Sequence, residues 1–77
     1  MLELTEEKIK MLMQLLKMME IPEEKAVEIA VAIETQKELN RFIDKLSEKN
    51  YEMTPEEVYE AMVEAVGDIQ LEEAGLL

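Results

Sequence analysis

Apolar residues recur along this chain at helical spacing, and a strand pattern is absent. The β-branched residues that cluster at 27–33 are interleaved with alanines and a glutamate, and only two glycines and two prolines interrupt the chain. This pattern predicts an all-α fold, a compact bundle of four to five short helices in a single small domain over residues 1–77. The helices are expected at about 5–20, 22–34, 36–49 and 55–66, with a short tail helix at 68–74.

Residues that favour helix ends support these boundaries. Each of the chain's three threonines lies where a helix N-cap is expected: Thr5, Thr35 and Thr54. The last two open the sequence T-x-x-E, in which the threonine and glutamate side chains each bind a free backbone N–H at the helix start. Leu4 and Ile9 are placed to pack across the first cap as a hydrophobic staple, and Pro22 is expected at the first helical position. Gly67 and Gly75 are expected to end helices.

A helix boundary near residues 34–36 is predicted although neither glycine nor proline marks it. With Ala26 at 0° and about 100° per residue, Ile33 falls at about 340° but Phe42 falls at about 160°. One straight helix would therefore present its apolar residues to two opposite sides, whereas a break lets both halves face one core. The alternative is a three-helix fold with one long helix at 22–49.

The helix expected at 5–20 has a wide apolar face. Its apolar residues cover about 220°, whereas a surface helix commonly shows an apolar stripe of about 100° or slightly more. Four of the chain's seven methionines lie on it: Met11, Met13, Met18 and Met19. Methionine is flexible and polarizable, and it is common on adaptable binding surfaces. The pattern favours either a partner or dimer interface around Met11, Leu15 and Met18, or a central helix that neighbours cover on two sides.

A second apolar cluster flanks the main apolar stripe of the helix expected at 55–66. Tyr59, Val63 and Val66 fall at about 80–140° from Val58 when each residue turns the helix by about 100°. Tyr59 and Val63 are therefore candidates for a further contact with a partner. The alternative is that these side chains pack beside the core.

The chain of 77 residues carries 19 acidic and 8 basic side chains, which give a formal net charge of −11. Residues 50–77 contain no base, and acids recur there at every fourth position, where like charges on a helix repel by about 0.2–0.5 kcal/mol per pair. This spacing indicates an acidic interaction face toward a basic partner, or else a solvated face on which glutamate favours the helix. The candidate acidic face consists of Glu56, Glu60, Glu64 and Asp68.

The composition excludes several kinds of chemistry. Without histidine and cysteine the chain has no thiolate, no disulfide, no ordinary zinc or haem site and no histidine general base. Ser47 is the only serine, and no activating base accompanies it. We therefore expect no enzyme activity, no catalytic or metal-binding residue and no cofactor. The net charge disfavours direct nucleic-acid binding, and no apolar run reaches the roughly 18–20 residues that cross a membrane.

These features together predict a non-enzymatic acidic protein–protein interaction module that self-associates, as a homodimer, through its methionine-rich helix face. The first alternative is an inhibitor that blocks the basic surface of a DNA- or RNA-binding partner by imitating phosphates, and the composition resembles that of small phage inhibitors of host defence enzymes. The second alternative is an adaptor that binds a partner's amphipathic helix. The acids and lysines among the first 20 residues are unlike a secretory signal peptide, so the cytoplasm is the expected location.

Overall fold

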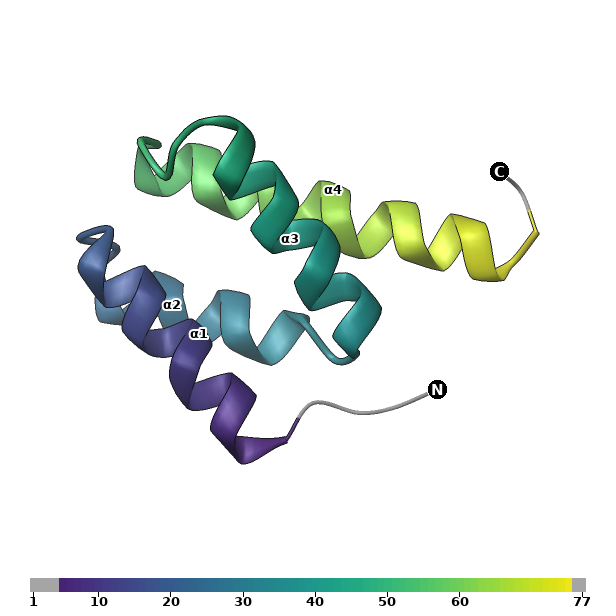
Figure 1. Ribbon diagram of the computed structural model, residues 1–77, viewed down its shortest axis with the longest axis horizontal. Helices are drawn as coiled ribbons and strands as arrows, with labels where there is room; N and C mark the ends of the chain where they lie inside the picture. The colour runs from purple at the N-terminus through teal and green to yellow at the C-terminus, as the bar shows by residue number, and fades with distance from the viewer. Residues whose placement is uncertain (1–4, 76–77) are drawn as a thin grey trace.

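The computed structural model describes residues 5–75 and confirms the all-α fold, with four helices and no β-strand in that range. The helices are α1 (Glu6–Met18), α2 (Glu23–Ala32), α3 (Gln36–Glu48) and α4 (Pro55–Glu73). In Figure 1, α1 lies beside α2, and α3 crosses α4. Across the described residues, no helix has both the length and the apolar character needed to cross a membrane.

One apolar core joins the four helices. α1 packs on α2, α2 packs on α4, and α4 packs on α3. Every helix contributes side chains that are at most 2% exposed: Leu12 and Leu16 from α1, Ile29 from α2, Phe42 and Leu46 from α3, and Val58 and Ala65 from α4. Within α1, α3 and α4 these residues recur at four- or seven-residue spacing, as expected for one side of a helix.

The predicted break near residues 34–36 is confirmed, because α2 ends at Ala32 and α3 begins at Gln36. The alternative of one helix over 22–49 is wrong. The two short helices both turn their apolar sides inward, and Phe42 of α3 is fully buried. A single helix would have placed that ring on the side opposite to the apolar residues of α2.

Capping boxes open α3 and α4, as the sequence predicts. At α3, the Glu38 carboxylate accepts from the backbone N–H groups of Glu34 at 2.9 Å and Thr35 at 3.1 Å. The Thr35 hydroxyl in turn accepts from the Glu38 N–H at 3.2 Å. Thr54 and Glu57 make the same reciprocal pair at the start of α4. The first box is buried, with Glu38 only 5% exposed, and the second is exposed to solvent.

The tail helix expected at 68–74 is not a separate element, because α4 continues unbroken through Gly67. A glycine inside an exposed helix costs about 1 kcal/mol relative to alanine, which is too little to end a helix that is anchored on both sides. Ile69 is buried and supplies the anchor beyond the glycine. The prediction holds for Gly75, which follows the C-cap Ala74 with a φ of 77°, a backbone conformation that suits glycine.

The remaining helix ends differ from expectation by one or two residues. α1 ends at Met18 instead of residue 20, since Glu20 adopts a left-handed φ of 62°. Pro22 is the N-cap of α2 and not its first helical residue, because its ψ of 142° is extended. Thr5 caps α1 by accepting from a backbone N–H in the first turn. Leu4, half of the expected hydrophobic staple, lies outside the described residues.

Candidate functional site

α1 lies at the edge of the bundle, because within residues 5–75 its backbone closely approaches that of α2 alone. Its buried side is formed by core leucines, but Met11 is 67% exposed and Met18 is 82% exposed. Leu15, between them, is half-buried against the core. Residues spaced by four and three positions share one side of a helix. Met11, Leu15 and Met18 therefore form one surface, called here the methionine surface, which neighbouring helices leave open.

A groove of about 390 Å³ runs between α1 and α3 beside the methionine surface. Lys8 of α1 donates a hydrogen bond to the side-chain oxygen of Gln36 of α3, which bridges the two helices. The other lining residues are apolar: Met11, Leu12 and Leu15 from α1, and Leu39 and Ile43 from α3. Because the backbones of α1 and α3 do not pack closely within the described chain, side chains alone form this groove.

Charge is distributed unevenly among the helices. α1 carries two acids and three bases, and α3 carries three of each. α4 carries seven acids and no base. The side of the molecule with the methionine surface and the α1–α3 groove is therefore close to neutral, while α4 holds most of the net charge of −11.

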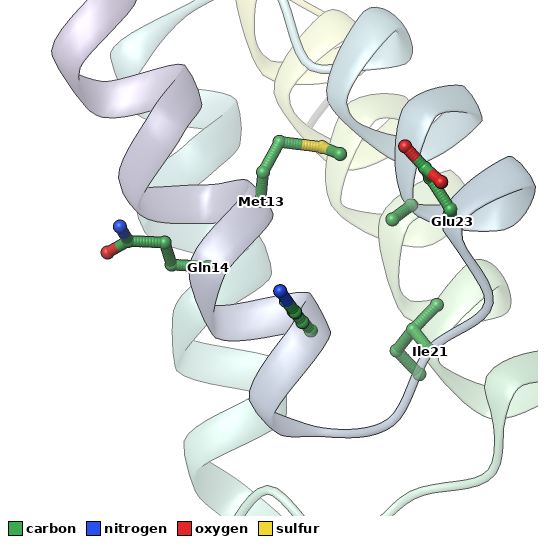
Figure 2. Close-up of a pocket in the computed structure, with 6 residues that line it drawn as sticks. Met13, Gln14, Ile21 and Glu23 are labelled. Carbon is green, nitrogen blue, oxygen red and sulfur yellow. The ribbon is translucent and has the colours of Figure 1, made fainter.

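A second hollow, of about 340 Å³, lies between α1 and the beginning of α2. Figure 2 shows Met13 reaching from α1 toward α2, with Glu23 on the opposite wall and Gln14 pointing away. The complete lining consists of Met13, Gln14, Lys17, Ile21, Glu23 and Ala26. These residues include no hydroxyl or thiol nucleophile, so the hollow offers apolar contact with one acid and one base on its wall.

Bases of α3 pair with part of the candidate acidic face of α4. Glu64 lies 3.7 Å from the ammonium group of Lys45, and Asp68 lies 3.6 Å from the same group. Asp68 also lies 3.5 Å from the guanidinium group of Arg41. Glu72, one turn further along α4, pairs with Arg41 at 2.5 Å. These side chains are partly exposed, so each pair contributes little by itself, but together they connect α3 to α4.

The other half of the candidate acidic face has a different environment. Glu56 and Glu60 are exposed, and within residues 5–75 they form no ion pair. The sequence analysis did not predict that half of the acidic face is paired and half is not, although the spacing of the charged residues on α3 and α4 is compatible with such pairing. Arg41 and Lys45 are four residues apart on α3, and the acids they meet are also four apart on α4. Two such rows can face each other once the helices are known to be neighbours.

Tyr59 and Val63 lie on α4 and are 37% and 52% exposed. The ammonium nitrogen of Lys25, from α2, lies 5.9 Å from the centre of the Tyr59 ring, within the range of a cation–π contact. Within the described chain, α4 does not approach α1 closely. The structure therefore does not bring Tyr59 and Val63 together with the methionine surface, and they belong to a separate face.

One acidic group in this region has a shifted pKa. The backbone N–H of Thr54 donates to the Glu57 carboxylate at 2.9 Å, and this bond, followed by the Thr54 hydroxyl, lowers the pKa of Glu57 below its usual value. Hydrogen bonds to the ionised form favour that form. Glu57 therefore acts as a helix cap that stays charged, and it is not suited to donate a proton to a substrate.

The sequence predicted only the α1 side of the α1–α3 groove. Met11 and Leu15 were identified from the width of an apolar face, but Gln36, Leu39 and Ile43 were not. The α3 wall could not be identified because nothing in the local pattern states which helix lies beside α1. No protein family, curated protein or solved structure matches this chain.

Proposed function

We propose that this protein is a small, non-enzymatic acidic interaction module that self-associates through the methionine surface of α1. One observation carries the proposal: Met11 and Met18 are 67% and 82% exposed on an edge helix, beside an apolar groove. Contiguous exposed apolar area is characteristic of interaction sites. Methionine suits such a site because its flexible side chain adapts to a partner.

The expected strength of this self-association follows from the exposed side chains. Complete burial of one methionine side chain stabilises by roughly 1.5–3 kcal/mol. Scaled by the exposed fractions of Met11 and Met18, 67% and 82%, burial in two copies gives roughly 4–9 kcal/mol. Association itself costs about 4–15 kcal/mol. Because this cost is as large as the gain, the methionines alone support at best a weak dimer, and a tighter one requires that each copy also fill the other's α1–α3 groove.

Charge favours α1 as the contact between copies. Two molecules that meet through α4 would bring seven acids against seven. Contact through α1 and α3 avoids this repulsion, because those helices are nearly neutral. Added salt should consequently change the dimerisation constant little.

Sedimentation equilibrium over a wide protein concentration range, at low and high salt, tests the proposal. The wild type is expected to dimerise at high concentration, and the double variant Met11→Glu, Met18→Glu is expected to remain a folded monomer. Val31→Glu is the matched control, since Val31 is 72% exposed but lies on α2. A wild type that stays monomeric at every concentration, or a control that dissociates equally, would refute self-association through α1.

The α1–α3 groove supports a second candidate function, an adaptor that binds the amphipathic helix of a different protein. Its apolar lining and volume of about 390 Å³ suit large apolar side chains of such a helix. The alternative of an acidic inhibitor of a DNA- or RNA-binding partner is less well supported. Glu64 and Asp68 already pair with bases of α3, which reduces the charge that α4 offers to a partner.

A further inference from the structure

Gly67 has no role within the chain that the described structure reveals. It lies inside α4, and a methyl group added at its Cα would meet nothing within 4 Å. Its φ does not lie in the left-handed region that favours glycine. Glycine at such a position lowers the folding equilibrium constant about fivefold relative to alanine. The fold therefore tolerates this glycine without requiring it.

The side chains next to Gly67 on the same face are apolar and exposed. Val63, one turn before it, is 52% exposed, and Leu71, one turn after it, is 41% exposed. Both fall within about 40° of Gly67 around the helix axis. Figure 1 shows the second half of α4, coloured toward yellow, extending past the other three helices. The strip Val63–Gly67–Leu71 thus presents a notch between two exposed apolar side chains on α4.

A notch of this kind favours a close helix crossing. The distance between two packed helices depends on the side chains at the point of contact, and small residues permit the closest approach. Val63 and Leu71 would then pack on either side of the crossing helix. A second helix in the notch would explain why α4 has a glycine at position 67, although alanine would make the free protein more stable.

The charge around the strip determines what kind of helix fits. α4 carries seven acids and no base. Bases of α3 pair with three of these acids, Glu64, Asp68 and Glu72, whereas within residues 5–75 Glu60 forms no ion pair. Glu60 lies on the same side as the strip, within about 20° of Gly67. A second copy of α4 would be repelled. We propose that the outer face of α4, with Gly67 at the crossing point, docks an amphipathic helix of another protein whose apolar side is flanked by lysine or arginine. This face is separate from the methionine surface, so the two proposals succeed or fail independently.

The test uses a fluorescently labelled helical peptide of leucine and lysine with all leucines on one side. Its binding is followed by fluorescence anisotropy at physiological ionic strength, against a peptide of equal composition in scrambled order. We expect the wild type to prefer the amphipathic peptide. Gly67→Ala should weaken that binding about fivefold or more, because the added methyl fills the crossing point. The same variant should unfold at a higher temperature, which excludes damage to the fold as the cause.

A matched pair of charge variants separates docking from general attraction. Glu60→Gln and Glu73→Gln each remove one acid from α4, but Glu73 lies about 120° away from Gly67. Docking at the notch predicts that only the first variant weakens binding. Equal losses from both variants, or unchanged binding by Gly67→Ala, would overturn the proposal and show that the peptide is held by net charge alone. Equal binding of the amphipathic and scrambled peptides would overturn it as well.

Discussion

The two capping boxes of this protein have the same chemistry but different burial, and their removal should have different costs. Glu38 is 5% exposed and accepts two backbone N–H groups at the junction of α2 and α3. Glu57 is exposed and accepts one, from Thr54. We predict that Glu38→Ala destabilises the protein at least twice as much as Glu57→Ala.

The magnitude follows from the groups left without a partner. A net hydrogen bond to a charged group stabilises by about 1.5–3 kcal/mol, and removal of Glu38 abolishes two. Release of a buried carboxylate from its desolvation cost offsets part of this loss, so we expect about 2–4 kcal/mol. The Glu57 carboxylate is exposed, so water can replace it as the acceptor for the Thr54 N–H, and Glu57→Ala should cost less than half as much. A domain of this length has a total stability of only about 4–12 kcal/mol, so the first variant should be visibly weakened.

Urea unfolding at neutral pH, followed by circular dichroism, measures both variants on the same scale. In thermal unfolding, the midpoint temperature should fall by roughly 8–30 °C for Glu38→Ala and by less than half as much for Glu57→Ala. Glu38→Gln keeps an oxygen acceptor and should lie between the wild type and Glu38→Ala. Equal destabilisation by the two alanine variants would refute the reasoning, because burial would then have no effect on the cost of losing the cap.

Three further predictions concern the helix ends and the α3–α4 contact. Glu20→Gly should stabilise the protein by about 0.5–1 kcal/mol in urea unfolding, because Glu20 has a left-handed φ of 62° that costs an L-residue roughly 1–2 kcal/mol. Since the folded pKa of Glu57 is lowered, its stabilisation is present above the usual value of 4.5 and is lost as the pH falls through the folded pKa. Unfolding measured from neutral to acidic pH should therefore show a smaller decline for Glu57→Gln than for the wild type. Arg41→Met removes the pairs to Asp68 and Glu72 and should cost about 1 kcal/mol at low salt and less at high salt, as measured by thermal unfolding.

Local signals predicted the helix starts well. Thr35 and Thr54 cap helices because the threonine hydroxyl and the glutamate three residues later each accept from the other's backbone N–H. These bonds form within four consecutive residues, so no distant residue is needed to predict them. The break before α3 was predictable from the rotation of the apolar face. The prediction that Gly67 ends a helix was wrong, because a single glycine destabilises a helix only slightly. The buried Ile69 lies beyond the glycine and stabilises the continuation of α4.

The candidate site was predictable only where one helix contains it. Met11 and Met18 are exposed on α1, the helix on which the sequence located them. The α3 wall of the groove and the ion pairs of Lys45 depend on which helices become neighbours. Which helices become neighbours depends on the packing of the whole core, and the spacing of residues along one sequence does not specify it.

The attachment of α1 has a consequence for how the molecule opens in solution. α3 and α4 are joined by packing and by ion pairs, whereas α1 is held through α2 and through the core leucines Leu12 and Leu16. Elements with fewer contacts open with a smaller free energy than the whole protein does. We expect amide hydrogens of α1 to exchange with solvent before those of α3 and α4, through partial openings that leave the α3–α4 hairpin intact. Each such opening would expose buried leucines next to the methionine surface, so ligand binding there should slow exchange throughout α1.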